Sequence, residues 1–139
     1  MATAVINNPE NKKLTLEDAL KYINDSVEDF HECTLIGPSM KGIYNDFPMH
    51  KVAIWGNIDL AQVLLDNGAD INSIGEDNDT PLHRAIAGRK LTMIKFLLSN
   101  GADVTLKNIY GSTVIDDALI SNDKNIIGLF ASYGVQQKN

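Results

Sequence analysis

The sequence predicts an all-α solenoid of stacked helix-turn-helix units with degenerate caps at both ends, and three observations support this fold class. Residues 79–104 contain, in order, the signals for a helix, a tight turn, a second helix and a glycine stop. Matching residues occur 33 positions earlier, and weaker matches occur 33 positions later. Two short helices cannot bury their apolar faces alone, so neighbouring copies are expected to cover them.

The unit at residues 79–104 has the clearest helix signals. Thr80 can cap its first helix, and Pro81 suits the first helical position because a missing N–H loses no hydrogen bond there. Gly101 is expected to end the second helix in a left-handed conformation. The apolar residues that recur at helical spacing are Leu82, Ala85 and Ile86 in the first helix, and Leu91, Ile94, Leu97 and Leu98 in the second.

The copies agree with one another in a single register. LLDNGAD at residues 64–70 precedes LLSNGAD at 97–103 by 33 residues, and PMH at 48–50 precedes PLH at 81–83 by the same offset. These residues resemble the ankyrin repeat, whose pattern is TPLHxA followed by a leucine pair and GAD. The resemblance covers about residues 42–135 and implies an ankyrin-repeat solenoid with β-turn fingers between its helix pairs.

The ends of the chain depart most from this pattern, as the ends of a stack of repeats require. We expect a frayed tail over residues 1–13 and a single ankyrin-repeat domain over residues 14–139. The domain divides into a helical capping repeat at 14–38, repeat 1 at 42–74, repeat 2 at 75–107, and a C-terminal capping repeat at 108–139.

Helices are expected in each unit in turn. The capping repeat predicts a helix over residues 15–35, with Leu16, Ala19, Leu20 and Ile23 on one apolar face. Repeat 1 has Phe47 in place of the capping Thr, which removes a side-chain cap. In the last unit the second helix is expected over residues 125–133, with less apolar bulk because no further repeat stacks on it.

A residue that tolerates positive φ stands two positions before the start of the first helix in every unit. Gly111 occupies this place before Thr113, and Asn78 and Asn45 occupy it in the other two units. Asn is the next residue after Gly to tolerate positive φ. The finger turn is therefore expected in all three units.

Composition limits the possible partners and the compartment. The net charge of −6 and the pI of about 4.9 argue against nucleic acid, since phosphate contacts need clustered Lys and Arg. No apolar run approaches the roughly 20 residues needed to span a membrane, and the N-terminus has no apolar signal region of ~7–15 residues. The single cysteine, Cys33, fits a reducing compartment. We expect a cytoplasmic protein.

No residue pattern supports catalysis, a cofactor or a metal. His50 and His83 occupy the Pro-x-His position, where the resemblance implies a structural hydrogen bond, and neither has a nucleophile pattern or zinc-ligand spacing nearby. Asp116 and Asp117 are neighbours about 100° apart around a helix, so they do not converge on one substrate atom. Residues 76–79 lack the remaining ligands of a calcium loop.

Recognition of another protein has more support. The resemblance implies that the finger tips and the exposed side of each first helix form a concave partner-binding surface. Trp55, Tyr44 and Tyr110 are of the residue types most often found as interface hot spots, although packing between helices is the alternative for Trp55. The candidate contact residues are Tyr44, Asp46, Lys51, Trp55, Glu76, Asp77, Asp79, Arg84, Ile109, Tyr110 and Asp117, and further variable helix positions are Ile54, Ala87, Ile120 and Ser121.

These observations predict a non-catalytic protein-binding module that inhibits or neutralises a partner by occlusion. The chain resembles the compact ankyrin proteins encoded beside bacterial toxins, which act as immunity proteins, and its acidic face would cover a basic toxin or enzyme. We expect a monomer or a 1:1 heterocomplex. The alternative is a regulatory or scaffolding ankyrin protein, or a host-directed effector, that binds a signalling or transcription protein.

Overall fold

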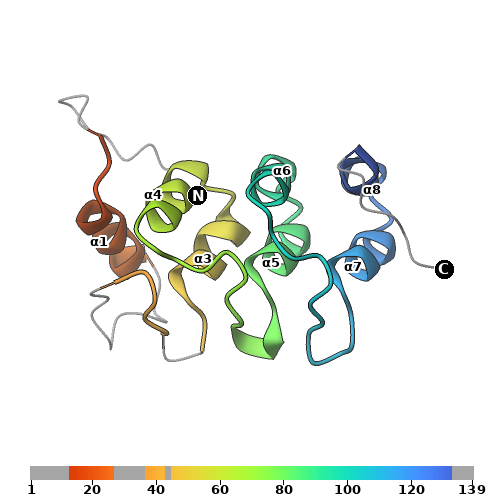
Figure 1. Ribbon diagram of the computed structural model, residues 1–139, viewed down its shortest axis with the longest axis horizontal. Helices are drawn as coiled ribbons and strands as arrows, with labels where there is room; N and C mark the ends of the chain where they lie inside the picture. The colour runs from red at the N-terminus through yellow and green to blue at the C-terminus, as the bar shows by residue number, and fades with distance from the viewer. Residues whose placement is uncertain (1–12, 27–36, 43–44, 133–139) are drawn as a thin grey trace.

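The computed structural model describes residues 13–26, 37–42 and 45–132, and its helices stack side by side in two rows (Figure 1). No strand occurs within these described ranges, and the all-α solenoid is confirmed. A short 3-10 turn, η1 (Glu76–Asn78), lies in the loop that precedes the central helix pair. The helices are α1 (Leu16–Ser26), α3 (Pro48–Trp55), α4 (Ile58–Asp66), α5 (Pro81–Ala87), α6 (Leu91–Ser99), α7 (Val114–Ser121) and α8 (Lys124–Ser132).

The first helices of the pairs form one row and the second helices form the other. α3, α5 and α7 lie side by side, and α4, α6 and α8 lie above them in the view of Figure 1. α1 packs against both α3 and α4 and covers that end of the stack. One apolar core runs between the rows, and its fully buried large side chains include Ile23, Met49, Leu64, Leu82 and Ile94.

Side-chain caps begin the first helices where the sequence predicts them. The hydroxyl of Thr80 accepts a hydrogen bond from the backbone N–H of His83 at 3.3 Å, and the Thr113 hydroxyl accepts from the N–H of Asp116 at 3.2 Å. Asp116 completes a reciprocal pair, because its carboxylate accepts from the Thr113 N–H at 2.9 Å. Phe47 makes no side-chain cap, as expected.

The turns that need a left-handed residue have one. Asn45, Asn78 and Gly111 adopt φ values of 66°, 58° and 73°, so the finger turn expected at these three positions is confirmed. Gly101 has φ of 81° just after α6, in the left-handed region expected for the glycine stop.

Three sequence predictions need adjustment or fall partly outside the described chain. Leu91 was expected in the core but is 37% exposed, while Met93, Ile94 and Leu97 are buried. At about 100° per residue, Leu91 lies roughly a third of a turn away from the face that these three residues share. The helix predicted over 15–35 is described only as far as Ser26, and most of the predicted tail over 1–13 also lies outside the described residues.

Candidate functional site

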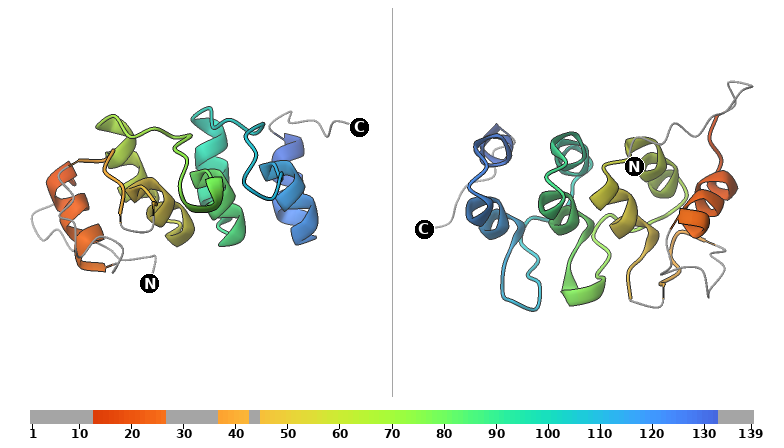
Figure 2. Two further views of the ribbon diagram at one scale, coloured as in Figure 1. Left: turned by 90° about the horizontal axis from the view of Figure 1, so that it is seen from below. Right: turned by 180° about the vertical axis from the view of Figure 1, so that it is seen from behind.

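The loops before α3, α5 and α7 project as fingers from one side of the stack (Figure 1; Figure 2). The row of first helices lies nearest to these fingers. We call this side the inner face. It comprises the finger residues 45–47, 74–80 and 107–113 together with α3, α5 and α7.

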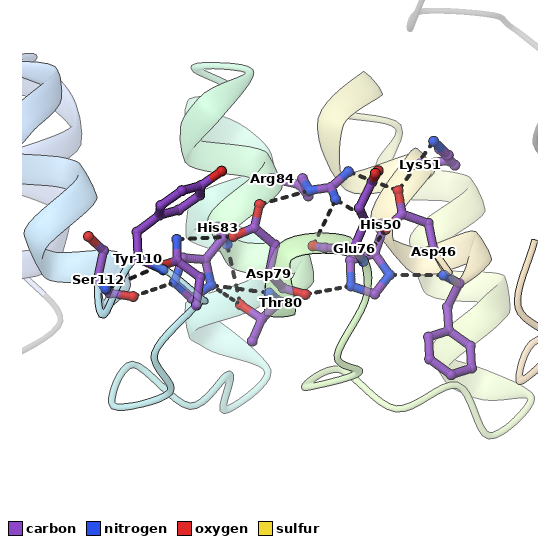
Figure 3. A network of polar contacts seen from close by, with 12 residues as sticks. Asp46, His50, Lys51, Glu76, Asp79, Thr80, His83, Arg84, Tyr110 and Ser112 are labelled. Carbon is purple, nitrogen blue, oxygen red and sulfur yellow. Dashed lines mark hydrogen bonds and ion pairs between the residues drawn. The ribbon is translucent and has the colours of Figure 1, made fainter. Parts of the chain in front are cut away.

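Two buried histidines join each finger to the next. The Nδ1 atom of His50 accepts the Phe47 N–H at 3.1 Å, and its Nε2 lies 2.8 Å from the carbonyl oxygen of Asp79 in the following finger (Figure 3). Since Nδ1 is an acceptor, Nε2 carries the proton and donates it to that carbonyl. Burial lowers the pKa of His50 and favours this neutral form.

His83 repeats the arrangement one unit later. Its Nδ1 accepts the Thr80 N–H at 3.1 Å, and its Nε2 lies 3.1 Å from the carbonyl oxygen of Ser112 in the third finger. The structural role expected for both histidines is confirmed. A buried ring that is hydrogen-bonded at both nitrogens fixes the spacing of two fingers.

Asp46 is the centre of a buried ion network between the first and second fingers (Figure 3). Its carboxylate accepts two hydrogen bonds from Arg84, at 2.9 and 3.1 Å, and one from the Glu76 N–H at 2.9 Å. The Lys51 ammonium lies 3.3 Å away. Burial disfavours the charged form, but the Glu76 N–H and the nearby cations outweigh it, so the pKa of Asp46 is lowered.

The location of Asp46 corrects the sequence prediction. Asp46 was placed among the exposed finger residues, yet its side chain is 0% exposed. It follows the left-handed turn at Asn45 and lies against the next repeat, so its charge meets Arg84 instead of solvent. Arg84 also donates through Nε to Asp79 at 3.1 Å. Asp46, Lys51, Arg84 and Asp79 therefore hold the fingers in position.

Gly75 is part of the same network and was not found from the sequence. A Cβ atom there would lie 2.7 Å from Nε2 of His50 and closer still to the Asp46 carboxylate. Only glycine leaves room for these two buried groups to lie beside the second finger. No local signal marks Gly75, because the residues that crowd it come from the preceding repeat.

The tips of the second and third fingers are exposed. Glu76 and Asp77 are exposed in η1, and Ile109 and Tyr110 are 56% and 74% exposed. The Ile109 N–H donates to the carbonyl oxygen of Asp77 at 2.9 Å, which ties the two tips together. Exposed apolar side chains on a tip that its own backbone holds in place are typical of a recognition surface.

Asp117 and Ile120 lie one helical turn apart on α7. Such i, i+3 neighbours share one side of a helix. Asp117 is partly buried and Ile120 is 77% exposed. Burial raises the pKa of Asp117, and the charges of Asp79 and Asp116 add to this effect against the opposing influence of His83.

Comparison with known families agrees with this architecture. A family model described as ankyrin repeats in three copies matches residues 16–108 and, in a second alignment, residues 49–139. The chain belongs to the ankyrin repeat family. Ankyrin repeats act as modules for protein–protein interaction, and the family is generally not catalytic. A search of curated proteins gave no significant match.

Within the described residues, no group of three or more His, Cys, Asp or Glu side chains is placed to hold a metal ion. None of the described helices is both long and apolar enough to cross a membrane.

The other two aromatic candidates are Trp55 and Tyr44. Trp55 is partly buried, and its ring meets the Tyr22 ring of α1 edge to face, with centroids 6.2 Å apart and an interplanar angle of 86°. This contact supports packing between helices, the alternative role considered for Trp55. Tyr44 lies outside the described residues.

Proposed function

We propose that this ankyrin protein inhibits or neutralises a protein partner by covering it with the inner face. The observation that carries the proposal is the exposed pair Ile109 and Tyr110 on a finger that is bonded to its neighbour. Large apolar side chains left mostly in solvent at a fixed position are typical of a recognition surface, and aromatic residues of this kind are common binding hot spots.

The candidate residues divide into two roles under this proposal. Glu76, Asp77, Ile109, Tyr110 and Asp117 would contact the partner directly, because they are exposed or partly exposed on the inner face. The buried network fixes the fingers that carry the first four of them. Its members are Asp46, Lys51, Asp79 and Arg84. Trp55 and Tyr44 are proposed to extend the contact toward the first finger.

The charge of the surface favours a basic partner. The chain carries a net charge of −6, and the tip residues Glu76 and Asp77 are acidic. An acidic face speeds encounter with a basic partner and rejects acidic ones. A bacterial toxin with a basic active-site region fits this description, and the chain would then be its immunity protein in a 1:1 complex in the cytoplasm.

Affinity capture tests the proposal. Tagged wild-type protein and a Tyr110→Ala variant would be used as baits in lysate of the source organism, with Leu91→Ala as a matched control on α6, outside the inner face. One basic protein that binds wild type and the control but not Tyr110→Ala supports the proposal, provided that the purified bait also inhibits that protein's activity.

Three other results would count against it. Several unrelated regulatory proteins would favour the scaffolding alternative. A partner that binds with its activity unchanged would show that the inner face does not act by occlusion, and failure to capture any partner would remove the support for an inhibitor.

A further inference from the structure

We propose that the part of the inner face formed by the third finger and α7 binds a protein segment in which a Lys or Arg stands next to a bulky apolar residue. The inference rests on the proposed function, since it names the chemistry of the partner that the inner face would take. The charges at two positions of the repeat are alike in the first two units and differ in the third.

Two positions of the repeat carry this pattern. The residue just before the helix cap is Asp46, then Asp79, then Ser112, at intervals of 33 residues. The fourth residue of the first helix is Lys51, then Arg84, then Asp117, at the same interval. The first two units pair an acid with a cation, whereas the third unit has an acid at the position of the cation.

The cations of the first two units are already engaged. Arg84 donates to both oxygens of Asp46, to Asp79 and to the carbonyl oxygen of Glu76. Lys51 lies against Asp46. Neither cation is left to neutralise Asp117, and in the described part of the chain Asp117 forms no ion pair.

Asp117 is therefore an acid without an ion-pair partner among the described residues. It is partly buried, and the carboxylates of Asp79 and Asp116 act on it electrostatically against an opposing influence of His83. A partner's ammonium or guanidinium group placed here would reproduce, in the third unit, the cation that the first two units supply themselves. Charge-assisted pairs of this kind are among the stronger polar contacts.

Exposed apolar side chains lie on α7 and on the third finger. Ile120, one turn further along α7, is 77% exposed, and Tyr110 is 74% exposed on the third finger. The third finger is bonded to the second, because the Asn108 amide donates to the Asp79 carboxylate at 3.2 Å. Figure 3 shows the Tyr110 ring directed toward Asp79 and Arg84.

Because this surface is both acidic and apolar, it favours one chemical type of partner segment. A purely apolar segment would cover Asp117 without pairing it, and an uncompensated buried charge is costly. An acidic segment or a nucleic acid would meet Glu76, Asp77 and Asp117 with like charge. A basic side chain beside an apolar one satisfies both parts, because its cation can pair with Asp117 and its apolar neighbour can cover exposed apolar surface.

Selection from a phage library of random 12-residue peptides on immobilised full-length protein tests the inference. Enriched peptides are expected to carry Lys or Arg within two residues of a Leu, Ile, Met, Phe or Trp. Synthetic versions should bind Asp117→Asn and Tyr110→Ala at least tenfold more weakly than wild type in fluorescence polarisation.

Each control variant loses the same kind of group as its test variant, either a carboxylate charge or an apolar side chain, at a position outside the proposed surface. Asp59→Asn removes an exposed acid on α4, and Leu91→Ala removes a partly exposed apolar residue on α6, so peptide affinity should change less than twofold in both. Circular dichroism would verify that every variant is folded. Enrichment of peptides without a basic residue, no enrichment at all, or equal binding by Asp117→Asn would overturn the inference.

Failure of this inference can be told apart from failure of the proposed function. A captured protein that is inhibited by wild type and by Asp117→Asn alike would leave the proposed function standing and reject the basic-apolar partner. Conversely, Asp117-dependent peptides without any inhibited protein would support the surface and reject the inhibitor.

Discussion

Replacing Asp46 by Asn should destabilise the fold through the cation that it leaves behind. Removing one partner of a buried ion pair typically costs about 3–5 kcal/mol. Asn can still accept the Glu76 N–H, and the Arg84 side chain is 14% exposed and keeps Asp79, so part of its charge remains compensated. We therefore expect a loss of about 2–3 kcal/mol in the free energy of unfolding.

Urea unfolding followed by circular dichroism would measure this change. A loss of that size should also lower the melting temperature of a chain of this length by roughly 6–12 °C. Asp59→Asn on α4 is the matched control, because it neutralises an exposed carboxylate, and its midpoint should stay close to that of wild type.

A double-mutant cycle identifies the cause. If the unpaired Arg84 is responsible, adding Arg84→Gln to Asp46→Asn should cost less than Arg84→Gln costs alone, with a coupling of about 1–3 kcal/mol. An Asp46→Asn protein within about 0.5 kcal/mol of wild type, or additive effects in the cycle, would refute the reasoning that this pair supports the fingers.

Three further predictions follow from the same face. Gly75→Ala should lower the free energy of unfolding by about 1–3 kcal/mol in urea titrations, because its Cβ would clash with the His50 ring. An unchanged midpoint would show that the second finger can shift to remove the clash at little cost. Stability should fall as the pH drops below the usual His value of 6.5, because the unfolded state then binds a proton that folded His50 resists; the slope should shrink in His50→Gln, and an equal slope would assign the effect elsewhere. Glu76→Gln combined with Asp77→Asn should slow association with a basic partner and flatten its salt dependence in stopped-flow measurements, whereas a wild-type rate at low salt would exclude steering by this tip.

Local and periodic features could be predicted from the sequence alone. The cap at Thr80, the left-handed residues Asn45 and Asn78, and the glycine stop at Gly101 depend on a few neighbouring residues, and the structure has them all. The stacking of the units follows from the 33-residue period, since a repeated apolar pattern implies repeated contacts. The structural role of His50 followed from the family resemblance.

The candidate site depended more on contacts between repeats. Burial of Asp46 was missed because the residue that pairs with it, Arg84, lies 38 positions further along the chain. Gly75 carries no local signal for the same reason, and the edge-to-face contact of Trp55 with Tyr22 joins two helices whose relative placement the pattern does not specify.

The sequence by itself determined the helices, their caps and the register of the repeats, because each of these depends on interactions within one unit or on strict periodicity. Only the tertiary structure decided which charged side chains are paired within the fold and which stay available to a partner. Asp46 and Asp117 are both acids near a helix start, yet one is buried between two cations and the other forms no ion pair among the described residues. Asp46 meets Arg84 of the following repeat, whereas Asp117 lies in the last unit and is influenced by His83 and Asp79 of the preceding one.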